Sequence, residues 1–175
     1  EEDITEHMTT LYQNVLVLDS GARGSTTTFI ENGQGDVLIA WENEAFLSMQ
    51  EEPGEYEIVV PSASVLCQPT VAVVDEVVDR RGSRAVAEEY LNYLYSDEAQ
   101  KLAGENYYRP ADQDIAKQFY TEEGTHEITE LPSDGKWMVT DVAMADISHF
   151  GGWDAVIEKH FSDGGIFDTI YERNR

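Results

Sequence analysis

The sequence predicts an α/β fold, because short apolar runs alternate with helical segments along the first 50 residues. Residues 15–18 form an apolar run followed by a turn, residues 22–31 have the pattern of a helix, and residues 36–41 form a second apolar run. A strand, a helix and a second strand in this order make a βαβ unit. In such a unit the strand ends and the helix N-terminus face one crevice, where open α/β sheets bind ligands.

The other elements are predicted from the spacing of apolar residues and from turn residues. Ser96 and Asp112 are typical N-cap residues, and each precedes a helical segment. Helices are predicted over residues 4–13, 42–50, 83–95, 96–106, 112–119 and 153–161, with a last one ending near 172. Extended segments are predicted over 56–60, 65–75 and 137–145, and the acidic stretch 121–136 is predicted to be a loop.

The charge of the chain is strongly skewed toward acid. Among 175 residues, 35 are acidic and 11 are basic, which gives a net charge of -24, although the charged fraction is an ordinary 26%. Such a surface argues against nucleic acid and anionic membranes as direct partners. Because no apolar run approaches the roughly 20 residues of a membrane span, we also expect no direct membrane insertion.

The balance between basic residue types points to a salty environment. Only four basic residues are Lys and seven are Arg. An acid-rich, Lys-poor composition is typical of halophilic proteins, and at about 1 M salt the Debye length falls to about 3 Å, so that surface repulsion no longer reaches an anion site. We therefore predict a halophilic source.

Catalytic and metal-binding motifs are absent from the sequence. It has no G-x-S-x-G, no H-E-x-x-H and no Walker loop, so we expect no enzyme and no cofactor. Four residues invite a metal hypothesis, but their spacing matches no zinc or EF-hand pattern, and we expect no metal site; they are Asp141, Asp146, His149 and His160.

Cys67 is the only cysteine, which excludes an internal disulfide. It lies within the apolar segment 65–75. We expect it to be a small buried residue of a strand.

The start of the predicted helix at 22–31 suits an anion. Backbone N–H groups of Gly21, Ala22 and Arg23 lack helical acceptors there, and the helix dipole is positive. Trp41 adds an indole N–H that donates but cannot accept. A site made only of donors favours sulfate over protonated phosphate. Taken alone, the turn is also compatible with plain chain reversal, and Trp41 with core packing.

Several sequence blocks resemble the C-terminal half of the sulfate/thiosulfate-binding proteins that supply ATP-driven importers. The blocks occur in the family's order and cover nearly the whole chain: DSGARGSTTTF, GDVLIAWENEAFL, PTVAVVD, AEEYLNYLYSDEAQ, NYYRPAD, FGGW and HFSDGGIFDTI. The resemblance implies that a desolvated dianion is bound by neutral donors. Here these would include the backbone at Gly21 and Ala22 and the indole of Trp41.

The resemblance also implies supporting roles around this helix start. Asp19, Ser20 and Arg23 would stabilise the loop, with Arg23 pairing with an acid such as Asp19 instead of touching the anion. The hydroxyl groups of residues 25–28 are expected to bond back to the preceding helical turn.

The family fold has two lobes of the periplasmic type II class. By resemblance, residues 1–43 belong to the second lobe, 44–104 to the first lobe, and 105–175 return to the second. The family's other sulfate donors lie in segments that precede Glu1, so we expect a partial protein without its N-terminal half. Some strands would then lack neighbours. The family is extracytoplasmic, in the periplasm or at the cell surface, although no export signal or anchor is recognisable here.

The sequence therefore predicts binding of sulfate or thiosulfate for delivery to the membrane permease of an ABC importer. Two alternatives stay open at this point. The first is another tetrahedral oxyanion, molybdate or phosphate. The second is a structural or interaction fragment without a ligand of its own.

Overall fold

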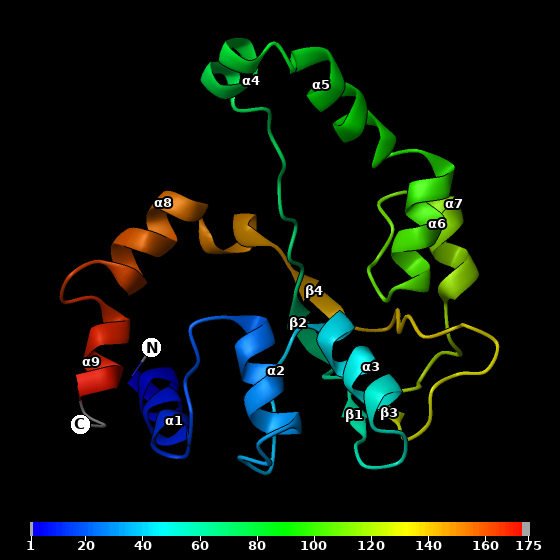
Figure 1. Ribbon diagram of the computed structural model, residues 1–175. Helices are drawn as coiled ribbons and strands as arrows, with labels where there is room; N and C mark the ends of the chain where they lie inside the picture. Colours follow the sequence, from blue (N-terminus) through cyan, green and yellow to red (C-terminus); the bar gives the residue numbers. More distant parts are fainter. Residues whose placement is uncertain (1, 173–175) are drawn as a thin grey trace. The chain divides into compact units, whose positions relative to one another are not determined.

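The computed structural model describes residues 2–172 and has an α/β architecture of many helices and two small sheets (Figure 1). The helical elements are α1 (Glu2–Gln13), α2 (Ala22–Ile30), α3 (Glu42–Glu51), α4 (Asp75–Arg81), α5 (Arg84–Tyr93), α6 (Asp97–Glu105), α7 (Gln113–Ala116), η1 (Lys117–Phe119), η2 (Ile147–Phe150), α8 (Trp153–Val156), the π-helical turn η3 (Ile157–Phe161) and α9 (Ile166–Glu172). The strands are β1 (Ile58–Val59), β2 (Ala63–Val65), β3 (Glu127–Ile128) and β4 (Ala143–Ala145).

The helices predicted from the sequence are confirmed to within a few residues at their ends. Both predicted N-caps are present: the Ser96 hydroxyl accepts the N–H of Ala99 at 3.3 Å, and the Asp112 carboxylate accepts the N–H groups of Asp114 and Ile115. The helix α4 and the short 3-10 helix η2 were not predicted.

The predicted strands at 15–18 and 36–41 are wrong for this structure. Both segments lie outside helices and strands, and neither has a β partner among residues 2–172. A β-strand forms only when its backbone is hydrogen-bonded to a neighbouring strand, and an apolar composition does not guarantee that such a neighbour is present. Most of the apolar side chains of these two segments are consequently exposed, with Val37 and Ile39 each at 81%, whereas Leu38 is half-buried.

Three further expectations about extended segments need correction. Only the end of 137–145 forms a strand, β4, and only the start of 65–75 belongs to one, β2. Cys67 follows β2 and is exposed, not buried, because no element covers that segment in the described part of the chain. The predicted loop 121–136 contains β3, which pairs antiparallel with β1 in the register Ile58↔Ile128.

The chain divides into two compact units. Unit 1 comprises the chain up to Ala40, Ala63–Leu66 and the part from Met144 onward, and unit 2 comprises Trp41–Ser62 and Cys67–Ala143. Within unit 1, α1 packs on α9, where Tyr12 meets the edge of Phe167 at 5.8 Å between ring centroids and Ile170 is buried.

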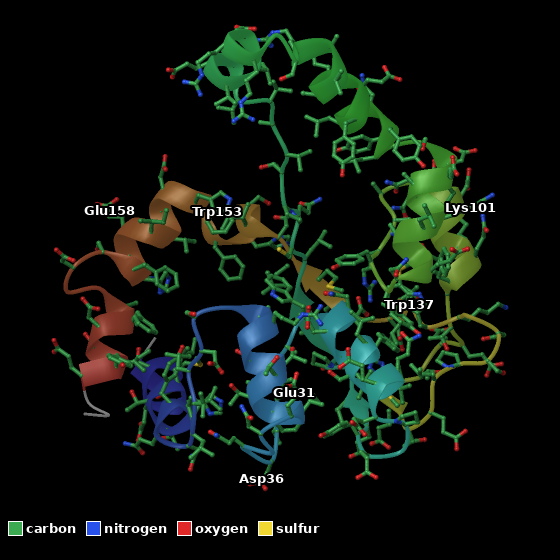
Figure 2. The ribbon with its side chains drawn as sticks, in the orientation of Figure 1. Glu31, Asp36, Lys101, Trp137, Trp153 and Glu158 are labelled. Atoms are coloured by element: carbon green, nitrogen blue, oxygen red, sulfur yellow. The ribbon has the colours of Figure 1, made fainter. Side chains whose placement is uncertain are left out.

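The core of unit 2 is built around Trp137, which is 1% exposed. Figure 2 labels Trp137 among the side chains of this unit. The indole N–H of Trp137 donates to the carbonyl of Gly104 in α6 at 2.9 Å, and its ring meets Phe46 of α3 edge-on at 5.3 Å between ring centroids. Phe46 and Val139 are fully buried beside it. This core fixes α3, and therefore also Trp41, the residue directly before α3.

A search for membrane-spanning helices in residues 2–172 finds no helix with the length and apolar content that crossing a bilayer requires.

Candidate functional site

The first part of the candidate site is the start of α2, in unit 1. Gly21 is the N-cap, with an extended backbone (φ -170°, ψ 159°), and its carbonyl accepts the N–H of Ser25 at 3.0 Å. Ala22 is the first residue of the helix. Because Gly21 carries no side chain and the first turn contains no acidic residue, no local carboxylate caps the first N–H groups.

The supporting residues predicted from the sequence lie at the same helix start. Asp19 is half-buried. A Cβ added to Gly24 would lie 3.6 Å from the Cβ of Asp19, so the Asp19 side chain lies against Gly24. Ser20 and Arg23 are exposed on either side of Gly21 and Ala22. Residues 19–23 are consecutive and comprise the turn that leads into α2 and the first residues of that helix.

The first two residues of the hydroxyl-rich run after this turn bond back to the helix, as the sequence predicts. The Ser25 hydroxyl donates to the Gly21 carbonyl at 3.4 Å, and the Thr26 hydroxyl donates to the Ala22 carbonyl at 3.2 Å. Both hydroxyl groups are therefore engaged with the helix backbone.

The second part of the candidate site is Trp41, the N-cap of α3, in unit 2. Its side chain is 52% exposed, and within residues 2–172 its indole N–H has no hydrogen-bond acceptor. Trp137 differs on both counts, since it is buried and donates to Gly104. Trp41 therefore presents an available donor next to a helix start.

Three consecutive residues contact the first two turns of α3, and the sequence analysis missed them. Arg109 forms a bidentate ion pair with Glu42, at 2.6 Å from Nε and 2.8 Å from Nη2. Tyr108 accepts a hydrogen bond from the side chain of Asn43 at 3.2 Å. Tyr107 stacks on Phe46 with ring centroids 4.9 Å apart. An Arg following two aromatic residues, in a chain with few basic residues, is the sequence signal that points to this cluster.

The acidic and histidine residues weighed for a metal site are engaged in local contacts. Asp141 contacts His126 at 3.1 Å, and Asp146 caps η2 together with His149, also at 3.1 Å. The hydrogen bonds from Ser148 and His149 lower the pKa of Asp146 to about 2. In the described residues no group of three or more such side chains is arranged to hold a metal ion.

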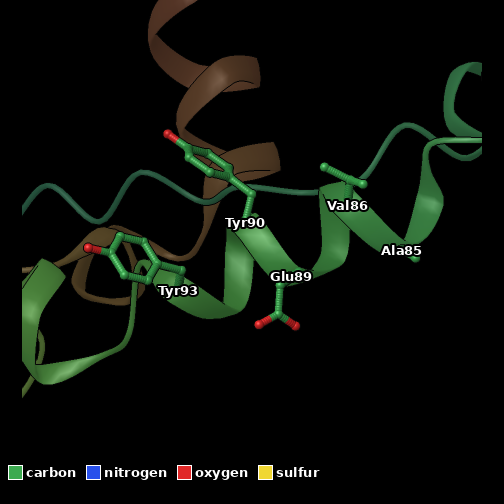
Figure 3. Close-up of a pocket in the computed structure, with 5 residues that line it drawn as sticks. All are labelled: Ala85, Val86, Glu89, Tyr90 and Tyr93. Atoms are coloured by element: carbon green, nitrogen blue, oxygen red, sulfur yellow. The ribbon is translucent and has the colours of Figure 1, made fainter.

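An open pocket on α5 has a different character. Figure 3 shows Val86, Tyr90 and Tyr93 along one side of the helix, with Ala85 and Glu89 completing the lining. Val86 and Tyr90 are 74% and 64% exposed. An apolar lining with one carboxylate does not favour an anion, so this pocket is not the candidate site.

The starts of α2 and α3 both lack a side-chain cap, so that each presents backbone N–H groups that its N-cap side chain does not accept. A family model described as "Bacterial extracellular solute-binding protein" matches residues 4–109, which is more than half of the chain. The chain belongs to this family.

The most similar relatives include two anion-binding proteins. The chain is 50% identical to the sulfate-binding protein of Escherichia coli over 164 residues, 93% of this chain and 45% of the relative. It is 42% identical to the thiosulfate-binding protein of Pseudomonas aeruginosa over 175 residues, 99% of this chain and 48% of the relative. The chain therefore spans about half the length of these curated relatives.

A shorter stretch of the chain matches a protein whose name describes an import function. A Cucumis sativus protein, named sulfate/thiosulfate import ATP-binding protein cysA, is 34% identical over 80 residues, which cover 46% of this chain and 19% of that protein.

Proposed function

We propose that this chain forms part of a solute-binding protein that binds sulfate or thiosulfate and delivers it to an ATP-driven membrane importer. The observation that carries the proposal is the 50% identity to a sulfate-binding protein across 93% of the chain. The thiosulfate-binding relative and the import protein support the same ligand class and the same destination. We propose an extracytoplasmic location, in the periplasm or at the cell surface, on the same grounds.

The residues that we propose as anion donors in the complete protein are Gly21, Ala22 and Trp41. The backbone N–H groups at the start of α2 and the indole N–H of Trp41 would donate to the anion, with Asp19, Ser20 and Arg23 supporting the loop. Each donor is neutral, and the positive end of the α2 dipole favours negative charge. Because none of these groups accepts a hydrogen bond, a fully deprotonated dianion is preferred over one that keeps a proton.

We further propose that the complete protein has two lobes of the type II class that close on the anion. By resemblance, residues 1–43 and 105–175 would contribute to one lobe and residues 44–104 to the other, with an N-terminal half completing both. Units 1 and 2 divide the chain differently, since Trp41–Ser62 and Cys67–Ala143 share one unit. Hinge closure would bury the anion and remove its water, which strengthens each hydrogen bond. The exposed segments at 15–18 and 37–41 support this proposal, since they have the apolar composition of strands that lack neighbours.

The decisive experiment is calorimetric sulfate titration of Trp41→Phe. It is carried out in the chain extended at its N-terminus to the length of its relatives, because we expect little or no binding by the 175 residues alone. A hydrogen bond to a charged group contributes about 1.5–3 kcal/mol, so affinity should fall about ten- to a hundredfold.

Trp153→Phe is the matched control. Trp153 is also exposed, at 67%, and also begins a helix, α8. Its replacement should leave sulfate affinity unchanged. Equal affinity of the Trp41→Phe and parent proteins would remove Trp41 from the site. Phosphate competing as strongly as sulfate would contradict the donor-only site.

A further inference from the structure

We infer that Arg109 is a positioning residue for Trp41, acting through the Glu42 carboxylate. The inference depends on the proposed function only where it predicts a change in sulfate affinity. The orientation of the indole is a property of unit 2, which contains all the residues involved, and it can be measured without any anion.

The ion pair lies directly next to the proposed donor. Glu42 follows Trp41 in the chain and is the first residue of α3. Its two carboxylate oxygens accept separate hydrogen bonds from Nε and Nη2 of Arg109, at 2.6 Å and 2.8 Å. Two parallel charge-assisted bonds fix both the position and the plane of the carboxylate. The two side chains are only 26% and 28% exposed, so water competes weakly for them.

Arg109 is itself anchored to the core. Its Nη2 also donates to the carbonyl of Val139 at 2.8 Å, and Val139 is fully buried. On the other side, the carbonyl of Trp41 accepts the N–H of Ala45 at 3.1 Å, the first hydrogen bond of the helix. The backbone at Trp41 is therefore fixed by the helix after it and by a guanidinium that the core holds in place.

The two residues before Arg109 contact the first two turns of α3. Tyr108 contacts Asn43, and Tyr107 stacks on Phe46 at an interplanar angle of 11°. Tyr107 has φ 63°, the only positive φ of a non-glycine residue in the part of the chain that the structure describes. This conformation is disfavoured for a bulky side chain and persists only where its surroundings impose it. Here the chain turns so that three successive side chains contact α3.

The pairing also matters for charge. A free carboxylate at Glu42 would lie beside a donor proposed to bind a dianion, and like charges repel. Arg109 compensates that charge without any requirement to contact the anion. Positioning and charge compensation can be separated, because Arg109→Met and Glu42→Gln both break the bidentate pair but change the net charge in opposite directions.

The first measurement follows the Trp41 indole N–H by NMR in the 175-residue chain labelled with 15N at tryptophan, with signals assigned from single Trp→Phe variants. Positioning predicts a lower heteronuclear NOE for the Trp41 indole in Arg109→Met and in Glu42→Gln, since Gln offers only one acceptor oxygen. Lys117→Met is the control. It removes the same charge from an exposed pair with Asp114 in unit 2 and should leave the Trp41 signal unchanged.

An unchanged Trp41 NOE in Arg109→Met would overturn the inference. If circular dichroism shows that this variant does not fold, Arg109→Lys decides instead, because it keeps the charge but loses the planar fork. A mobile indole in Arg109→Lys supports positioning, and a rigid one overturns it.

The second measurement is sulfate affinity in the extended protein. If the indole points at the anion for only a tenth to a third of the time, the dissociation constant rises about three- to tenfold. Positioning predicts this loss for both Arg109→Met and Glu42→Gln. Tighter binding by Glu42→Gln would show that charge alone acts and would overturn the inference. A parent protein that does not bind sulfate would refute the proposed function, and the NMR result would still decide the role of Arg109.

Discussion

At the scale of single residues, Gly104 shows how closely the core of unit 2 is packed. A Cβ placed on Gly104 would overlap the ring of Phe119, and the Gly104 carbonyl accepts the indole N–H of Trp137. Gly104 is therefore required at this position for space, not for an unusual φ. The absence of a side chain allows α6 to approach η1.

We expect Gly104→Ala to destabilise the chain by about 1–3 kcal/mol, because an added methyl in a packed core forces neighbouring side chains to move. Urea unfolding followed by Trp fluorescence measures the change. In the Gly104→Ala background, Phe119→Leu should recover part of the lost stability, as expected for two residues in contact. Simple additivity of the two substitutions would contradict the packing argument.

The candidate site was predicted unevenly from the sequence, and distance along the chain is the reason. Gly21 and Ala22 are recognisable because the turn and the helix that expose their N–H groups are adjacent in sequence. Arg109 escaped detection because its partner Glu42 is 67 residues away, and only tertiary packing brings the two together. The positions of Gly21, Ala22 and Trp41 as sulfate donors remain predictions.

At the scale of elements, helices were predicted well and strands poorly. A helix satisfies its backbone within its own segment, so the spacing of apolar residues and a cap such as Asp112 define it locally. A strand requires a partner that sequence does not identify. Residues 15–18 and 36–41 have strand composition without a partner in the described chain, whereas β3 pairs with β1 although its segment reads as a loop.

His126, next to β3, contacts both Val60 beside β1 and Asp141, which is distant in the sequence. Its Nδ1 lies 3.0 Å from the Val60 carbonyl, and its Nε2 lies 3.1 Å from the Asp141 carboxylate. A neutral imidazole has one N–H and can donate to only one of these acceptors, whereas the protonated ring donates to both. The pKa of His126 is raised, mainly by the hydrogen bond to the Val60 carbonyl and secondly by the hydrogen bond to the Asp141 carboxylate.

The same contact lowers the pKa of Asp141, since the hydrogen bonds from His126 and Gly124 outweigh the partial desolvation that raises it. The Asp141 contribution to stability is present above its ordinary pKa of about 3.9, and the His126 contribution is complete below its ordinary pKa of about 6.5. Both act fully between these values. The His126 contribution is then lost as pH rises through its raised pKa.

We therefore expect the stability difference between the parent chain and His126→Gln to be largest near pH 5 to 6 and to shrink as the solution becomes alkaline. Thermal unfolding from pH 5 to pH 9 measures it. His160→Gln serves as the control for the loss of an imidazole elsewhere. A difference that grows with rising pH would show that His126 is neutral in the folded chain.

At the scale of the whole molecule, the surface combines exposed apolar segments with a large excess of acid. The sequence has 41% hydrophobic residues, which would suffice for an ordinary core. Many large apolar side chains are exposed nevertheless, including Val37, Ile39 and Val86. Completion of both lobes by further sequence, as proposed above, would account for this exposure. It does not account for the net charge of -24, which is spread along the entire chain.

This charge leads to a prediction about salt. The 11 basic residues are too few to pair one to one with all 35 acidic side chains. Even where one cation pairs with several acids at once, as Arg84 does with Asp75, Asp79 and Glu88, the chain keeps a large excess of acid. The unpaired acids repel one another most at low ionic strength, where the Debye length is about 30 Å at 0.01 M, and much less where it is about 3 Å at 1 M. The folded state is more compact than the unfolded chain, so screening should favour folding.

We expect the thermal midpoint to rise between dilute buffer and 2 M KCl, by roughly 2–4 °C for each 1 kcal/mol of repulsion that salt screens. Sucrose, which is uncharged and does not screen, is the control for preferential exclusion from the surface. The rise should begin well below molar salt if screening is its cause. A midpoint that stays constant in KCl, or that sucrose raises equally, would contradict both the role of charge repulsion and the predicted adaptation to salt.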